Sequence, residues 1–130
     1  MWDKMLPKLE GKIADLGCGP CMIYKGKDVD LTGVDSSEEA INQAKINYPK
    51  GNFVVADSRK TGLPSESFDS VIMLGLLDYF EEWEEVLVEA RRILKPGGFI
   101  LATLYNGFQG HDWTEYEHLT GEWYLYTEQV

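Results

Sequence analysis

The sequence has few basic residues and no long apolar run. Its 130 residues include 12 Lys and Arg against 22 Asp and Glu, which gives a formal net charge of −10. Because affinity for a phosphate backbone comes largely from Lys and Arg that displace counterions, we expect neither nucleic acid nor an anionic membrane as a partner. No stretch could span a bilayer, and Met1–Pro7 lacks the basic and apolar regions of a secretory signal. These absences predict a cytoplasmic protein.

Cysteine and histidine are also scarce, with two of each. Two cysteines, Cys18 and Cys21, cannot build a disulfide framework, and we predict no metal site. At this length, with 44% apolar residues, a chain buries roughly two thirds of its unfolded surface, enough for one core without covalent links. No repeat, low-complexity tract or linker divides it, so residues 1–130 are predicted to form one domain.

Short β-branched runs alternate with helical patterns, which is typical of βαβ units and a mostly parallel sheet. Helices are predicted after Ser36, an N-cap with Glu39 three residues on, and from Trp83 to Leu94, where apolar residues recur at helical spacing. Only Pro20–Asp30 separates the first two strands, so a helix there has one or two turns. Five strands are predicted, at Lys12–Leu16, Leu31–Asp35, Asn52–Ala56, Ser70–Leu74 and Phe99–Tyr105.

A glycine-containing turn follows the first predicted strand. Gly17 and Gly19 let the backbone approach a ligand closely, and the helix start behind them offers free N–H donors to an anionic group. A strand-to-helix turn that needs glycine for its geometry alone remains an alternative.

Acidic residues stand at the carboxyl ends of three predicted strands, namely Asp15, Asp35 and Asp57. Asp35 follows Gly17 by about 18 residues, close to the spacing at which a carboxylate meets ribose hydroxyls in nucleotide-binding βαβ units. Asp35 as a helix cap is the alternative, although Ser36 and Ser37 already offer caps. In an open α/β sheet this edge is where ligands bind.

Five segments in this order resemble the motifs of class I S-adenosylmethionine-dependent methyltransferases: Ile13–Gly19, Thr32–Ser37, Val54–Asp57, Leu63–Val71 and Arg92–Gly98. The resemblance implies a Rossmann-like, doubly wound, mostly parallel α/β sheet with strand order 3-2-1-4-5. It also implies S-adenosylmethionine as cofactor, S-adenosylhomocysteine as product and a small molecule as methyl acceptor.

The resemblance assigns roles to matching positions. Gly17 and Gly19 would pass under the methionyl part of the cofactor, with Asp15 supporting its ammonium group. Asp35 would hold the ribose hydroxyls, and Asp57 would accept from the adenine amino group. Four further residues complete the implied cofactor site: Cys18, Ser36, Ser58 and Leu74.

The sequence departs from the family pattern in the loop and in the tail. Cys21 stands where a third glycine is expected, and residues 106–130 show no clear period. We therefore expect a sheet that lacks the family's last two strands, with strand five as an exposed edge. The aromatic-rich tail, residues 106–130, is predicted to be a lid or acceptor pocket, or to pack on the sheet edge or at a homodimer contact. Two alternatives are that a second copy pairs with the exposed edge of strand five, and that residues 122–127 form an extra strand along it.

Three other functions compete with methyl transfer. Cys18 and Cys21 form the thioredoxin tetrapeptide, but the strand, helix and Trp expected before it are missing. A nicotinamide oxidoreductase shares the turn and Asp35, yet Met22 replaces its third glycine. A protein that holds the cofactor without transferring its methyl group also fits. If a catalytic base exists, the candidates are His111, His118, Tyr105 and Asp78, none of which lies in a recognisable motif.

Overall fold

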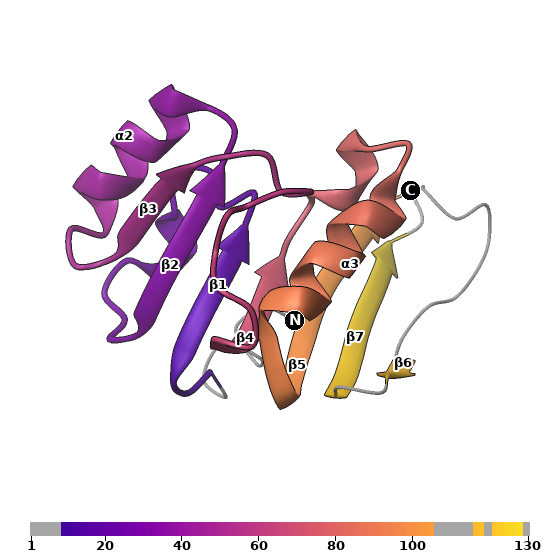
Figure 1. Cartoon of the computed structure of the whole chain (residues 1–130). Coiled ribbons are helices and arrows are strands. Elements are labelled where there is room, and N and C mark those ends of the chain that lie inside the picture. Colours follow the sequence, from indigo (N-terminus) through magenta and orange to yellow (C-terminus); the bar gives the residue numbers. More distant parts are fainter. Residues whose placement is uncertain (1–8, 106–115, 119–120, 129–130) are drawn as a thin grey trace.

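A single twisted sheet carries the fold (Figure 1). The computed structural model describes residues 9–105, 116–118 and 121–128. Its first five strands are parallel and lie in the order β3-β2-β1-β4-β5, as the sequence predicts. They are β1 Lys12–Leu16, β2 Asp30–Asp35, β3 Asn52–Val55, β4 Phe68–Met73 and β5 Leu94–Tyr105. Strand β5 begins before the predicted Phe99 because Leu94 already pairs with Phe68, ahead of an irregularity in the register.

The sheet continues beyond β5, contrary to the expectation of an exposed edge and of two missing strands. Strand β7, Gly121–Glu128, pairs in parallel with β5, and β6, Tyr116–His118, pairs with β7 in the antiparallel direction. The alternative of an extra strand over residues 122–127 is therefore confirmed. An unpaired strand edge offers a row of N–H and C=O groups, and an aromatic-rich segment is well suited to pair with it. A homodimer through the edge of strand five is contradicted, because β7 occupies that edge. The lid and the dimer contact through the tail stay predictions.

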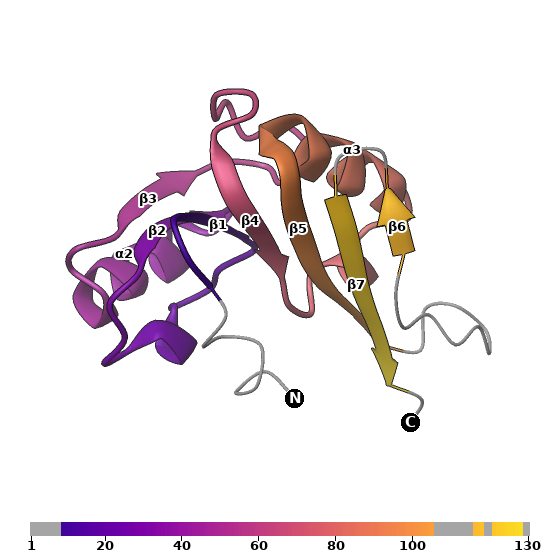
Figure 2. The same cartoon turned by 90° about the horizontal axis from the view of Figure 1, so that it is seen from below.

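Helices cover both faces of the sheet, as the view from below shows (Figure 2). On one face, α2, Glu38–Asn47, and the single 3-10 turn η2, Met22–Tyr24, pack in a core cluster with β1, β2 and β4. On the other, α3, Trp83–Ile93, packs in a second cluster. The short crossover between β1 and β2 is confirmed. No helix in the described part of the chain is long and apolar enough to cross a membrane.

The cap of α2 differs from the prediction by one residue. Ser37, not Ser36, is the N-cap, and its Oγ accepts a hydrogen bond from the Ala40 N–H at 3.1 Å. The shift has a local cause, because the Asp35 carboxylate accepts from the Ser37 N–H at 2.9 Å and so keeps Ser36 and Ser37 in a turn before the helix.

The loop between β3 and β4 is tied to α3 by the buried Glu89 carboxylate. Its Oε2 accepts from the Thr61 N–H and hydroxyl, both at 2.7 Å, while its Oε1 accepts from Arg92 Nε at 2.7 Å. Arg92 in turn donates to the Leu63 carbonyl at 2.7 Å. Burial alone would raise the pKa of Glu89, but the hydrogen bonds from Arg92 and Thr61 outweigh it and bring that pKa to about 2. The loop that carries Asp57 at its start is thus anchored on a helix.

Candidate cofactor site

The glycine loop after β1 is fixed to the end of β2. The N–H groups of Gly17 and Cys18 both donate to the Val34 carbonyl, at 2.7 and 2.9 Å. Gly17 and Gly19 have φ angles of 70° and 54°, in the left-handed region that glycine adopts most readily. Glycine at these two positions therefore allows the chain to turn back over the carboxyl edge of the sheet.

The two glycines differ in their surroundings. A Cβ on Gly17 would lie 2.5 Å from Leu76 Cδ1, so this glycine allows the segment after β4 to pack against the loop. A Cβ on Gly19 would meet no atom within 4 Å. Gly17 therefore serves internal packing, whereas Gly19 leaves open space in which a ligand can approach the backbone.

Asp35 links the glycine loop to the start of α2. Its Oδ2 accepts from the Gly19 N–H at 2.9 Å, and its Oδ1 accepts from the Ser37 N–H at 2.9 Å. Because a carboxylate oxygen can accept about two hydrogen bonds, each oxygen keeps capacity for one further donor. Two neighbouring hydroxyl groups, such as those of a ribose, would supply two donors.

Asp15 lies beneath the loop, on the same face of β1 as Tyr24 and the cysteines. It is 3% exposed, and no ion pair in the described part of the chain involves it. Burial raises the pKa of Asp15 to about 7; the Tyr24 hydroxyl lowers it in part, and the negative charge of Asp35 raises it further. The Tyr24 hydroxyl is itself buried and makes no hydrogen bond of good geometry within the described residues.

Asp57 follows β3 and forms an ion pair with Arg59, whose Nη2 lies 2.7 Å from Asp57 Oδ2. The side-chain hydrogen bond from Arg59 lowers the pKa of Asp57 to about 2. Ser58 beside it is buried, and Leu74 at the end of β4 is partly buried against the α2-side core cluster.

The structure brings together many of the residues predicted from the sequence. Asp35 contacts Gly19 directly, and the backbones at the ends of β2 and β3 meet where the Ala56 N–H donates to the Asp35 carbonyl at 3.0 Å. Ser36 is exposed beside them. The sequence analysis did not identify Leu76 and Arg59 as residues of this edge, because a leucine after a strand and an exposed arginine carry no distinctive pattern. Only the opposite charges of Asp57 and Arg59, two residues apart, could have indicated Arg59.

The candidates for a catalytic base that the structure describes lie on three different elements. Asp78 lies in the 3-10 turn η3, Leu77–Tyr79, immediately after Leu76. Tyr105 ends β5 and His118 ends β6. His111 lies outside the described residues.

The two cysteines are free thiols. The pKa of Cys18 is raised, first by its hydrogen bond with Cys21 and then by burial. A dithiol that reduces disulfides needs the opposite shift, because the thiolate is the nucleophile. The arrangement therefore argues against the thioredoxin-like alternative.

Known proteins share this fold and these motifs. A family model described as a methyltransferase domain matches residues 14–102. A ubiquinone biosynthesis O-methyltransferase of Thiobacillus denitrificans is 27% identical over 113 residues, which cover 80% of this chain and 48% of that protein. The 27-O-demethylrifamycin SV methyltransferase of Amycolatopsis mediterranei is 32% identical over 105 residues, 72% of this chain and 39% of that protein. A solved S-adenosylmethionine-dependent methyltransferase of Thermotoga maritima matches with a TM-score of 0.65 at 26% identity, over 75% of this chain and 46% of that chain.

The strand order and the edge site thus define a Rossmann-like α/β protein of the methyltransferase class. The chain belongs to the methyltransferase domain family, whose cofactor is S-adenosylmethionine. It spans about half the length, or less, of the curated relatives it matches.

Alanine substitution should separate the two glycines. Gly17→Ala adds a left-handed alanine and a clash with Leu76, so we expect the free energy of unfolding to fall by about 2–4 kcal/mol. Gly19→Ala adds only the backbone strain, about 1 kcal/mol. Urea denaturation of both variants measures the difference, and Gly26→Ala, which also has a positive φ and open surroundings, is the control. Equal losses at Gly17 and Gly19 would contradict the assigned packing.

Asp15 should make stability fall as pH rises. The folded pKa of about 7 exceeds the unfolded value near 3.8, so the folded state holds an extra proton between these values. The contribution of Asp15 is present below pH 4 and is lost as pH rises through 7, by at most ~1.4 kcal/mol per pH unit. Asp15→Asn removes this slope, so at pH 8 the variant should be more stable than the wild type in urea denaturation. The control Asp28→Asn changes an exposed carboxylate and should keep the wild-type slope above pH 5; an unchanged slope in Asp15→Asn would disprove the assignment.

Proposed function

We propose that the chain binds S-adenosylmethionine at the carboxyl edge of the sheet and transfers its methyl group to a small-molecule acceptor. The observation that carries this proposal is the Asp35 carboxylate, which accepts a hydrogen bond from the Gly19 N–H, while Gly19 itself has open space around the position of a Cβ. Family membership supports the reaction type, and relatives named for ubiquinone biosynthesis and for a rifamycin support a small acceptor.

The groups at this edge fit the chemistry of the cofactor. Each Asp35 carboxylate oxygen has one acceptor position left, so Asp35 would accept hydrogen bonds from both ribose hydroxyls. Cys18 and Ser36 would flank the ribose. Gly17 and Gly19 would lie under the methionyl part. Asp57 and the backbone of Ser58 would receive the adenine.

Asp15 fits the cationic end of the cofactor. A buried carboxyl with a pKa near 7 is easily ionised by a nearby positive charge, because an opposite charge favours the ionised form. The ammonium group of the bound ligand, directly or through water, would provide that charge. Leu74, at the end of β4 on the same face, would form an apolar wall near the ammonium group.

Methyl transfer asks this chain mainly for alignment. When bound, the cofactor supplies an electrophilic methyl group on a sulfonium sulfur. The chain would hold that methyl group in line with the acceptor and keep water away, since correct alignment supplies much of the rate enhancement in such a displacement. A base is optional for this reaction; of the four candidates, Asp78 lies in η3, which follows Leu76, the residue packed on Gly17.

The Asp35 carboxylate should control cofactor affinity. Asp35→Asn keeps the shape of the side chain but removes its charge and one acceptor oxygen. We expect S-adenosylhomocysteine to bind the variant about ten-fold more weakly or worse, the loss typical of a charged hydrogen bond. Isothermal titration calorimetry measures the affinities.

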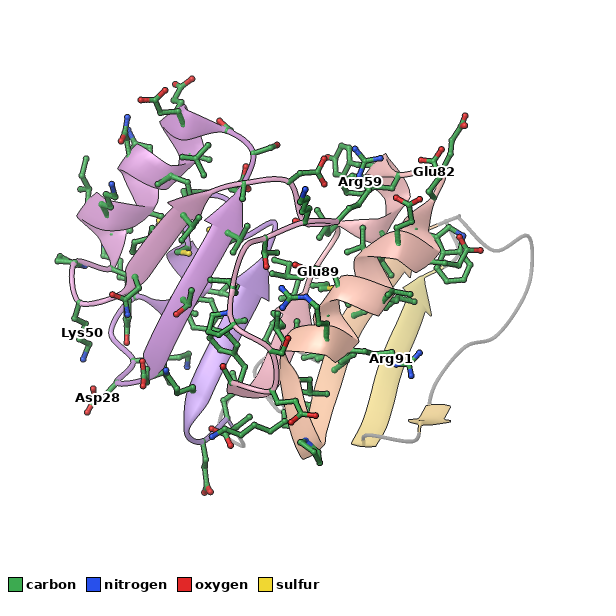
Figure 3. The ribbon with its side chains drawn as sticks, in the orientation of Figure 1. Asp28, Lys50, Arg59, Glu82, Glu89 and Arg91 are labelled. Atoms are coloured by element: carbon green, nitrogen blue, oxygen red, sulfur yellow. The ribbon has the colours of Figure 1, made fainter. Side chains whose placement is uncertain are left out.

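Asp28→Asn is the matched control, because Asp28 is an exposed carboxylate whose partner Lys50 lies outside the proposed site (Figure 3). It should bind the ligand as the wild type does. Equal affinity of wild type and Asp35→Asn would contradict the site. If the wild type does not bind S-adenosylhomocysteine but reduces insulin disulfides, the redox alternative is favoured.

Turnover should distinguish a methyltransferase from a protein that only holds the cofactor. We expect formation of S-adenosylhomocysteine to rise when phenols, carboxylic acids or amines are added one class at a time. At subsaturating cofactor, Asp35→Asn should form S-adenosylhomocysteine more slowly than the wild type, because less cofactor is bound. Tight cofactor binding without transfer to any class would instead favour the non-catalytic alternative.

A further inference from the structure

The Arg59 side chain joins two segments at the carboxyl edge of the sheet. Its guanidinium forms the ion pair with Asp57, approaches Glu82 at 3.8 Å and lies over the Phe80 ring at 5.2 Å from the ring centre. Figure 3 shows Arg59 and Glu82 close together above α3. Arg59 therefore connects the end of β3 to the segment that leads into α3.

The Asp57 carboxylate is engaged through both of its oxygens. Oδ1 accepts from the Arg59 backbone N–H at 2.8 Å and from Nε at 3.0 Å. Oδ2 accepts from Nη2 at 2.7 Å and more weakly from Nε at 3.3 Å. Each oxygen offers about two acceptor positions, and the single hydrogen on Arg59 Nε is shared between them but lies nearer Oδ1. Oδ1 is therefore filled by two donors, whereas Oδ2 has one strong donor, Nη2, and can accept a second from outside.

The ion pair matters more for the state of Asp57 than for stability. The side chains of Arg59 and Asp57 are 38% and 45% exposed, and exposed ion pairs add little to the free energy of folding. A ligand that covers Asp57 would, however, strip water from its charge, which is costly without a partner. Arg59 supplies that partner, while Phe80 and Glu82 restrain its guanidinium.

We propose that Arg59 is a positioning residue that selects the 6-amino group of the cofactor's adenine by leaving one oriented acceptor position on Asp57. Arg59 acts through Asp57 and makes no contact with the reacting atoms. The inference rests on the proposed function, because it takes adenine as the ligand part at Asp57. It goes further in naming the residue that makes Asp57 selective.

Two ligands and two variants test the proposal. The ligands are S-adenosylhomocysteine and its analogue with purine in place of adenine, which lacks the 6-amino group. Arg59→Ala should weaken the binding of S-adenosylhomocysteine by about three- to ten-fold and leave the affinity for the analogue unchanged. Arg59→Lys should lie between, because lysine keeps the charge but not the two parallel hydrogen bonds. Calorimetry measures the affinities, and thermal unfolding confirms that both variants are folded.

Lys50→Ala is the matched control. It breaks the exposed Lys50–Asp28 ion pair, 2.8 Å long, on the far side of the molecule from Arg59 (Figure 3). It should bind both ligands as the wild type does.

Three results would overturn the role of Arg59. An equal loss for both ligands would show that Arg59 only braces the two segments. Unchanged or tighter binding of S-adenosylhomocysteine by Arg59→Ala would show that it is irrelevant or obstructs Asp57. A wild type that binds neither ligand would contradict the proposed function itself, and with it this inference; normal binding of S-adenosylhomocysteine by the wild type isolates the failure to Arg59.

Discussion

The Val34 carbonyl receives two backbone N–H groups of the glycine loop, and the position of the other groups at the carboxyl edge depends on this contact. It turns the loop back over β2, which brings the Gly19 N–H within reach of Asp35. Asp35 then fixes Ser37 and so the start of α2. Strand end, loop and helix start therefore form one unit joined by a single carboxylate, and the left-handed conformation of Gly17 and Gly19 is the backbone condition for it.

The same unit carries an electrostatic cost. Asp15 is enclosed beneath the loop, near the negative charge of Asp35 and without an ion-pair partner in the described residues, so its pKa rises to about 7. A fully apolar residue there would suit folding better, but it could not stabilise a bound cation. In the proposed cofactor site, Asp15 would lower the stability of the free chain and would become ionised beside a cationic ligand, a balance often found where proteins bind ligands.

Much of this architecture could be predicted from local patterns. The β-branched runs located the first four strands closely, and the acids at strand ends were placed correctly because parallel strands bring their carboxyl ends to one edge. The errors arose where distant or competing contacts decide. Asp35 moved the helix cap from Ser36 to Ser37, the pairing of residues 121–128 with β5 is a long-range choice, and the packing of Leu76 on Gly17 depends on two loops that meet only in the fold.

The cysteine pair shows why a tetrapeptide alone does not determine chemistry. Cys21 has φ 57°, so it takes the left-handed conformation at the position where the family pattern expects glycine, and its side chain is buried. Its N–H donates to the Cys18 carbonyl at 3.2 Å, and only the single 3-10 turn η2 follows it. A redox pair needs the N-terminus of a full helix or a nearby cation to stabilise its thiolate. Here the hydrogen bond with Cys21 raises the pKa of Cys18 most, and burial and the neighbouring carboxylates raise it further, so this environment keeps the thiol protonated.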